Sequence, residues 1–313
     1  MTALDSPLLI DAKHEAKNIE NRIQELLRAN SAEGVIMGVS GGIDSAVLAT
    51  LVVRAVGTGR FCAYYLHDRD SSEELSARAK LMADWLGIEL KCQDITPAMQ
   101  KMKIYSPLIM RLAALSGSLN RYLNTNTYRF LFPESYFIST LRRDDFGGNK
   151  IKSFFYKNTV GPVEAAFNAR HIYRRKLLEQ YAKEKNWLVL GAANRTELMV
   201  GWFVKGGIDD LPFSPIIGLY KTQVIQLAKY LGLPCEILNQ APSPDMLKGI
   251  TDESALGISY STLDVILDYI DCGMSDKEIV SKGISQKDLS LVRTMNNLSA
   301  WKRMPENADT PAA

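Results

Sequence analysis

Residues 34–50 read GVIMGVSGGIDSAVLAT, and this stretch decides the fold. The apolar run from Val35 to Val39 is typical of a buried parallel strand, and Ala46 to Leu51 have the composition of a helix packed against it. The hexapeptide SGGIDS (40–45) lies between them. Two adjacent glycines allow a tight turn with bare N–H groups, and the start of the following helix attracts anions. The stretch therefore predicts a phosphate-binding turn.

This turn differs from the two common nucleotide-binding loops. The G-x-x-x-x-G-K-[ST] spacing with its lysine is absent from it, and so is G-x-G-x-x-G. The alternative is an ordinary glycine-rich turn in which Ser40 or Asp44 caps the helix.

The alternation of strands and helices continues on both sides of the turn. Apolar residues at 3-and-4 spacing predict an amphipathic helix from Ile10 to Asn30. After the turn we expect a strand from Phe61 to Leu66, a helix from Glu73 to Leu86 closed by a glycine, and a strand from Ile88 to Cys92. This order predicts an α/β fold with a doubly wound parallel sheet, in which ligands bind beyond the carboxyl ends of the strands.

The regular alternation is lost between about residues 97 and 165, which we interpret as a helical insertion or variable segment. It mixes aromatic and basic residues, among them Tyr128, Arg129, Tyr136, Arg142 and Arg143. Such side chains can stack on and neutralise a nucleotide-like ligand. The alternative is that the aromatic rings pack on the body of the protein or on a second subunit.

Beyond this segment the chain returns to regular structure. We expect a basic helix from Phe167 to Lys185 and a buried strand from Trp187 to Gly191, followed by the polar residues of ANRTE (193–197). Further helices are expected at 219–232, 259–271, 275–282 and 285–300, with a proline-rich loop at 240–252. The polar residues after this strand point to the same sheet edge as the SGGIDS turn.

Composition excludes several classes of protein. The 313 residues are 46% apolar, enough for a buried core, and 37 basic against 35 acidic residues give a net charge of +2. No charge footprint for nucleic-acid binding is visible, and no cationic leader or apolar stretch of about 18 residues predicts secretion or a membrane span. Four isolated cysteines argue against a zinc site or a disulfide framework. We expect a single-domain cytoplasmic protein (1–313) whose cysteines lie in the core.

Seven motifs, taken together, resemble the ammonia-dependent NAD synthetases of the N-type ATP pyrophosphatase superfamily. They are SGGIDS (40–45), SSEEL (71–75) with the following helix and LGIE, LVLGAANRTELMVGWF (188–203), GLYKTQV (218–224), LGLPCEIL (231–238), APSPDMLKGITDESALGISYSTLD (241–264) and SAWKRMP (299–305). The resemblance covers about two thirds of the chain and skips about residues 97–165.

The resemblance implies a homodimer with an adenine nucleotide alpha hydrolase-like fold that binds ATP and Mg²⁺. A carboxylate substrate, by default deamido-NAD, would attack the α-phosphate of ATP, and ammonia would displace AMP from the acyl-adenylate. No glutaminase domain is visible, so ammonia would come free or from a separate glutaminase. The resemblance implies no nucleic-acid or membrane partner.

The resemblance also implies roles for individual residues. It implies that Asp44 and Glu197 bind magnesium and that Lys221, counted with them as catalytic, contacts ATP phosphate. It implies these remaining ATP-binding residues: Ser40, Gly41, Gly42, Ser45 and Ser243. It implies these substrate-binding residues: Arg170 or Arg174, Lys205, Asp209, Asp210, Trp301 and Lys302.

The match to the family is weaker on the substrate side. Family members have a glycine-rich GDGG segment where this chain has the shorter GGIDDLP (206–212), and a terminal His-Lys pair where it has Trp301-Lys302. A threonine that contacts ATP in the family aligns with Ala192. Three hypotheses follow: amidation of deamido-NAD, the same adenylation chemistry on another carboxylic acid, or a nucleotide-binding homologue without turnover.

Overall fold

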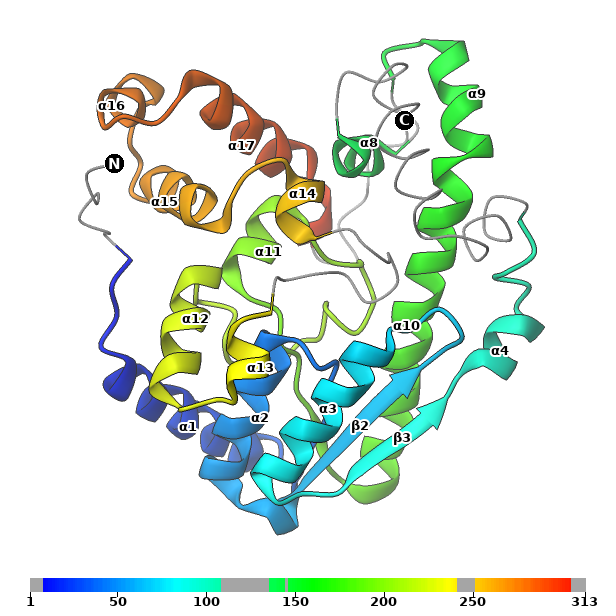
Figure 1. Cartoon of the computed structure of the whole chain (residues 1–313), viewed down its shortest axis with the longest axis vertical. Coiled ribbons are helices and arrows are strands. Elements are labelled where there is room, and N and C mark those ends of the chain that lie inside the picture. The colour runs from blue at the N-terminus through cyan, green and yellow to red at the C-terminus, as the bar shows by residue number, and fades with distance from the viewer. Residues whose placement is uncertain (1–7, 108–134, 144–145, 241–250, 305–313) are drawn as a thin grey trace.

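The computed structural model describes residues 8–107, 135–143, 146–240 and 251–304 (Figure 1). In these ranges four parallel strands form one sheet in the order β3-β2-β1-β4. The strands are β1 (Val35–Gly38), β2 (Phe61–His67), β3 (Leu90–Asp94) and β4 (Leu188–Val189). The predicted parallel sheet is therefore confirmed.

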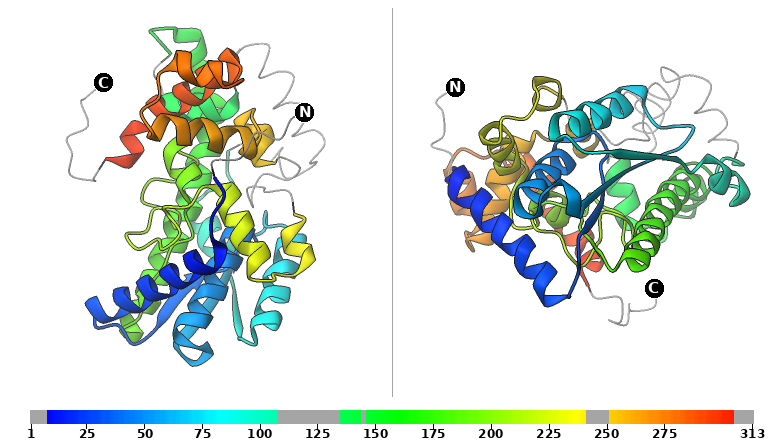
Figure 2. Two further views of the ribbon diagram at one scale, coloured as in Figure 1. Left: turned by 90° about the vertical axis from the view of Figure 1, so that its left-hand side faces the viewer. Right: turned by 90° about the horizontal axis from the view of Figure 1, so that it is seen from below.

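Helices cover both faces of the sheet. On one face lie α2 (Ile43–Val56) and α3 (Glu73–Leu86), and α1 (Ala12–Ala29) and α12 (Lys221–Tyr230) pack against α2. The long α10 (Val160–Lys185) covers the other face, as the view from below shows (Figure 2). The sheet is doubly wound, as the sequence predicts.

The side chains of β1 alternate between two apolar cores. Val35 and Met37 are fully buried in the core shared with α1, α2 and α12, whereas Ile36 is buried against α10. This is the period-2 alternation of a strand that is covered on both sides.

A third core is formed by α8 together with the C-terminal helices, at the opposite end of the molecule from the outer ends of α1 and α2 (Figure 1). Its helices are α8 (Tyr136–Arg142), α14 (Asp252–Leu256), α15 (Tyr260–Asp271), α16 (Asp276–Ser281) and α17 (Gln286–Leu298). Val200 of α11 (Arg195–Val200) and Tyr220 beside α12 belong to the same core. The C-terminal helices are thus joined to elements that follow the sheet.

Most expected boundaries lie within about two residues of the observed ones, but α10 begins at Val160 rather than at the expected Phe167. The third strand begins at Leu90 rather than Ile88, because Gly87 is left-handed and the N–H of Ile88 still bonds Ala83 O, 3.0 Å away, to close α3. The fourth strand is also shorter than expected. The remaining short helices are η1 (Thr58–Arg60), α4 (Thr96–Lys101), α9 (Lys150–Asn158), α13 (Cys235–Leu238) and η3 (Ala300–Arg303).

Two further expectations concern the cysteines and the variable segment. The cysteines were expected in the core, and this is wrong for three of them: Cys62 is buried, but Cys92, Cys235 and Cys272 are exposed on the edge strand, at a helix start and at a helix end. All four are free thiols. Of the aromatic and basic residues of the variable segment, Tyr128 and Arg129 lie outside the described residues, and so does the side chain of Tyr136.

Candidate active site

The site lies at the point in the sheet where the order of strands changes sides. From β1 the chain proceeds to β2 and β3 on one side, whereas β4 pairs with β1 on the other side. In such sheets ligands bind at this point, beyond the carboxyl ends of the strands. The turns after the two strands meet here, because Asn194 Nδ2, after β4, donates a hydrogen bond of 2.9 Å to Asp44 Oδ1, after β1.

The SGGIDS turn is held by its own hydroxyl groups. Ser45 Oγ donates to Gly42 O (2.9 Å) and lies 3.1 Å from Ser40 Oγ. Gly42 is the N-cap of α2, and among the described residues no side chain caps this helix start. The alternative in which Ser40 or Asp44 caps the helix is therefore wrong. The N-terminal end of α2 is left available to an anion.

The position of Gly41 requires glycine. Its φ is +80°, and a Cβ there would lie 2.3 Å from the carbonyl oxygen of Leu75 on α3. The turn therefore passes directly over the neighbouring helix, which fixes the direction of its peptide groups.

A buried lysine joins two carboxylates beside the turn. Lys221, the first residue of α12, is 2% exposed, and its Nζ lies 2.5 Å from Asp44 Oδ2 and 3.4 Å from Glu197 Oε1. Asp44 stands in the first turn of α2 and Glu197 in the first turn of α11. Three helix starts therefore bring the three predicted catalytic side chains together.

The electrostatics of this group are strongly perturbed. Burial raises the pKa of Glu197 to about 8, with Asp44 adding to the shift and Lys221 opposing it. Burial alone would lower the pKa of Lys221, but the neighbouring carboxylates raise it above its ordinary value. The lysine is charged at neutral pH, and a further cation beside these carboxylates would favour the ionised form of Glu197.

Three residues of this group were not predicted from the sequence. Asn194 is fully buried; besides bonding Asp44, it accepts from the N–H of Glu197 as the N-cap of α11. Asp252 (5% exposed) accepts a hydrogen bond of 2.9 Å from the hydroxyl of Tyr260, whose ring lies 5.3 Å from Lys221 Nζ. The Asn-x-x-Glu spacing after a strand was the signal for Asn194. Nothing in the sequence distinguished Asp252 from an ordinary first-turn carboxylate.

The donor set of the group fits magnesium. Asp44 and Glu197 supply carboxylate oxygens that converge on one point, where Lys221 Nζ now lies. Asp252 Oδ1 is buried and has no hydrogen-bond partner in the described part of the chain. Within those residues no three His, Cys, Asp or Glu side chains converge as a metal site. Two carboxylates completed by phosphate oxygens and water are a usual way in which proteins bind Mg²⁺.

The predicted substrate-side residues form a second charged group. Lys205 Nζ lies 3.5 Å from Asp210 Oδ2 and donates to Met304 O (2.9 Å). Lys302 donates to Gly201 O (2.8 Å), at the end of α11, and to Phe203 O in the segment that follows. Burial lowers the pKa of Lys302 to about 8, although nearby carboxylates raise it in part. A fraction of this lysine is therefore neutral near pH 8.

Asp209 is bound to a residue of α10 that was not predicted as part of the site. His171 Nδ1 lies 2.6 Å from Asp209 Oδ2. Burial would raise the pKa of Asp209, but His171 and Arg174 hold it below its ordinary value. Asp209 is therefore an ionised carboxylate in the middle of a cationic group.

The two candidate arginines of α10 lie in different surroundings. Arg170 is 2% exposed; its Nε lies 3.0 Å from Asp68 Oδ2, and its Nη2 bonds Asp70 after β2. Arg174 is also buried (7% exposed), and its positive charge lowers the pKa of Asp209. The charge of Arg170 is thus matched by two carboxylates at another strand end.

The last two predicted residues are Trp301 and Ser243. The indole of Trp301 donates to Leu141 O (3.4 Å), and the Arg143 guanidinium lies 5.0 Å from its ring centre, so Trp301 links η3 to α8. Ser243 lies outside the described residues.

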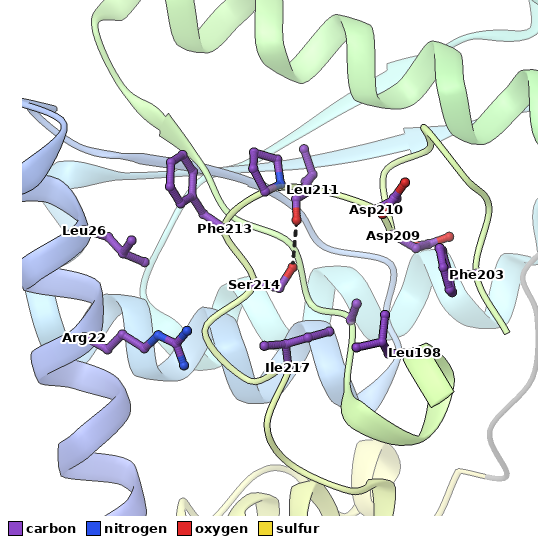
Figure 3. A pocket seen from close by; sticks show the side chains of 12 residues that line it. Arg22, Leu26, Leu198, Phe203, Asp209, Asp210, Leu211, Phe213, Ser214 and Ile217 are labelled. Carbon is purple, nitrogen blue, oxygen red and sulfur yellow. Dashed lines mark hydrogen bonds between the residues drawn. The ribbon is translucent and has the colours of Figure 1, made fainter. Parts of the chain in front are cut away.

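A cavity of about 180 Å³ borders the second charged group (Figure 3). Asp209 and Phe203 line one end of it, and Arg22 of α1 lines the other (Figure 3). Its wall includes Ala193 and Leu198, which lie next to Asn194 and Glu197 in the chain. Among the described residues no helix has both the length and the apolar character needed to cross a bilayer.

Comparisons with known proteins give a consistent result. A family model described as NAD synthase matches residues 15–109 and 150–306. An NH(3)-dependent NAD(+) synthetase of Thermotoga maritima is 37% identical over 250 residues, which cover 78% of this chain and 83% of that protein. One of Methanosarcina mazei is 31% identical over 295 residues, covering 92% and 96%.

Solved structures agree on the fold. The structure of an NMN synthetase from Francisella tularensis superposes with a TM-score of 0.69 at 26% identity, covering 97% of this chain and 99% of that chain. An NH3-dependent NAD synthetase from Campylobacter jejuni, in complex with the nitrate ion, gives a TM-score of 0.64 at 20% identity and covers 96% and 100%.

Proposed function

The chain belongs to the NAD synthase family, and from this premise we propose that the group formed by Asp44, Glu197 and Lys221 is where ATP is split to activate a carboxylate. The enzyme is an ATP-dependent, AMP-forming ligase that makes an amide with ammonia. One observation supports this placement above all. A buried lysine joins two carboxylates at the carboxyl edge of the sheet, beside an uncapped helix start.

The chemistry explains why these groups are needed. A carboxylate is a poor acyl donor, so one of its oxygens first attacks the α-phosphorus of ATP, and the bond from that phosphorus to pyrophosphate breaks. Ammonia then attacks the acyl carbon, loses a proton, and AMP leaves with the former carboxylate oxygen. The first step places negative charge on the departing pyrophosphate, and positive groups fixed beside that charge lower the barrier.

We assign the described residues to this step as follows. The peptide groups of the SGGIDS turn and the N-terminal end of α2 bind the pyrophosphate portion of ATP. Lys221 moves from its carboxylate partners to a phosphate oxygen when ATP enters. Asp44 and Glu197 would hold Mg²⁺, which supplies charge neutralisation of the phosphates when bound. Ser243 is retained as a proposed phosphate contact from the sequence alone.

We place the acid substrate beside the second charged group. Arg174, Lys205 and Lys302 supply positive charge there, and Asp209 and Asp210 orient these cations. Of the two arginines we favour Arg174, because its charge acts on Asp209 of this group, whereas Arg170 bonds Asp68 and Asp70 at another strand end. Trp301 lies beside this group, with its ring centre 5.8 Å from Lys302 Nζ.

The default acid is deamido-NAD, as the family's activity implies. A second candidate is the corresponding mononucleotide acid, which keeps the same pyridine carboxylate. The structural similarity to a protein described as an NMN synthetase favours it, together with the shortened segment 206–212 and Trp301 in place of histidine. A homologue without turnover is disfavoured, because a non-catalytic protein has no chemical need for both carboxylates and the lysine.

An isotope experiment tests the function and selects the acid. The purified protein is incubated with ATP, Mg²⁺, ammonium and one of the two acids, whose carboxylate is labelled with ¹⁸O. The nucleotides are then separated and analysed by mass spectrometry. We expect AMP and pyrophosphate, with one ¹⁸O atom in AMP. ADP as the main nucleotide product, or AMP without ¹⁸O, would refute carboxylate adenylation.

We further propose one domain spanning residues 1–313, a homodimer and a cytoplasmic location. Ile151 and Phe154, 77% and 68% exposed on α9, support a subunit contact, because large apolar side chains rarely stay in water together. Sedimentation equilibrium measures the dimer directly. Ammonia is the nitrogen donor, and a separate glutaminase as its source remains part of the proposal.

A further inference from the structure

Helix α15 bonds to the starts of both helices that carry the catalytic charges. Its carboxylates Asp264 and Asp271 are about two turns apart and so lie on the same side of the helix. Each of them bonds a residue of α11, Thr196 or Arg195, and also a residue at the start of α12. Glu197 stands in the first turn of α11, and Lys221 is the first residue of α12.

The contact at Asp264 is a closed set of buried hydrogen bonds. Thr196 Oγ1 donates to Asp264 Oδ1 (2.6 Å), and the N–H of Thr222 donates to Asp264 Oδ2 (2.8 Å). Thr196 Oγ1 in turn accepts from the N–H of Lys221 (2.8 Å). Asp264 and Thr196 are both fully buried, so water does not compete for these bonds.

The contact at Asp271 joins the same two elements in a wetter place. Arg195 Nε donates to Asp271 Oδ2 at 2.8 Å, and the hydroxyl of Tyr220 donates to the same oxygen at 2.5 Å. The side chain of Asp271 is 23% exposed, so solvent screens this pair more than it screens Asp264. Asp264 and Thr196 are therefore the stronger of the two connections.

We infer that Asp264 and Thr196 are positioning residues for adenylation: their buried hydrogen bonds set the separation between Glu197 and Lys221. This inference rests on the proposed function of those two side chains. Glu197 and Lys221 are 24 residues apart in the chain and stand on different helices, one of them only six residues long. A short helix start needs an outside support to hold a charged group to within the tolerance that catalysis requires.

The chemistry of Thr196 makes the role testable. Its hydroxyl is a donor to Asp264 and an acceptor from Lys221, so a methyl group of the same shape removes both bonds. Thr196→Val keeps the volume and leaves two buried polar groups without partners, whereas Thr196→Ser keeps the hydroxyl. Comparing the two separates the hydrogen bonds from the packing.

The experiment measures steady-state kinetics of wild type, Thr196→Val and Thr196→Ser, with folding checked by circular dichroism and thermal melting. For Thr196→Val we expect kcat for pyrophosphate release to fall about 100-fold, as for a displacement of about 1 Å, while the KM for ammonium stays within about twofold. Thr196→Ser should restore most of the rate. Asp268→Asn is the matched control; it removes a carboxylate of the same helix that is not bonded to α11 or α12 in the described residues, and should keep the wild-type rate.

The outcomes are distinguishable. A folded Thr196→Val enzyme with wild-type kcat overturns the inference, and so does a loss that merely follows the fraction of unfolded protein. If Thr196→Val does not fold, Asp264→Asn replaces it, since it keeps the acceptor for Thr222 and changes only the atom facing Thr196. A wild-type kcat in that variant again overturns the inference. If wild type itself makes no AMP with either acid, the proposed function fails and this inference fails with it.

Discussion

Removing the ammonium group of Lys221 should be costly, and the structure allows the cost to be estimated. At an effective dielectric constant of about 20, contacts of 2.5 and 3.4 Å to Asp44 and Glu197 correspond to gross attractions of about 7 and 5 kcal/mol. The desolvation of the buried charges offsets most of this attraction. Breaking such a buried pair by removing one partner typically costs about 3–5 kcal/mol. Lys221→Met should therefore lower the melting temperature by about 6–10 °C.

The carboxylates left behind give a second, independent signal. Without the lysine, the positive charge that lowers the pKa of Glu197 is gone, so that pKa should rise still further above its ordinary value. Millimolar Mg²⁺ should bind the freed carboxylates and stabilise Lys221→Met more than wild type, because no ammonium group competes with it. Pyrophosphate release should fall by about 100-fold or more.

Differential scanning fluorimetry with and without Mg²⁺, combined with a pyrophosphate assay, measures all three effects. Lys229→Met is the matched control, because Lys229 is an exposed lysine on the same helix. The assigned ion-pair geometry would be refuted if Lys221→Met had the melting temperature of wild type, or if Mg²⁺ raised its melting temperature no more than that of wild type.

Three further predictions concern single positions. Asp44→Asn and Glu197→Gln should each fold and each lose about 100-fold or more of pyrophosphate release, and wild-type turnover in either would remove the metal assignment. Gly41→Ala should abolish ATP binding measured by calorimetry, because its Cβ would lie 2.3 Å from Leu75 O in a backbone conformation with φ of +80°; unchanged affinity would contradict the geometry. The pKa of Lys302 is about 8 in the folded protein and 10.5 ordinarily, so between these two pH values the folded state binds fewer protons than the unfolded state. The free energy of unfolding should therefore rise by up to about 3 kcal/mol across that interval. Urea titrations should show this rise in wild type and a flatter profile in Lys302→Met; equal profiles would show that Lys302 is not held in a desolvating site.

The sequence was most informative where local pattern and chemistry coincide. The SGGIDS turn could be placed because a buried strand precedes it and a helix follows it, and the structure puts Asp44 where a helix start meets the sheet edge. The family resemblance led to Glu197 and Lys221, and the structure brings both side chains to Asp44. Their positions follow from the connectivity of a parallel sheet, which a sequence pattern predicts well.

What the sequence did not predict depends on contacts between distant segments. The pairing of His171 with Asp209 requires α10 to lie beside the loop after α11, and no local pattern reports that distance. The burial of Asp264 is equally invisible, since an aspartate on an amphipathic helix ordinarily faces water. The uncapped start of α2 is a third case, because Ser40 and Asp44 were both chemically suitable caps and the geometry of the turn excluded them.

The two halves of the site are supported by different parts of the fold. Asp44 stands on α2, which packs in the core shared with α1 and α12. Glu197 and Lys221 stand on α11 and α12, whose starts are hydrogen-bonded to Asp264 of α15 in the C-terminal core. The ATP half is therefore complete only when both cores are folded and packed together, so its geometry constrains a large part of the chain. The proposed acid half consists instead of α10, the segment 206–212 and η3. Of these, η3 also bonds carbonyl groups at the end of α11 through Arg303 and Lys302. The departures from the family pattern fall in the segment 206–212 and in η3, so we expect changes there to act first on which acid is bound.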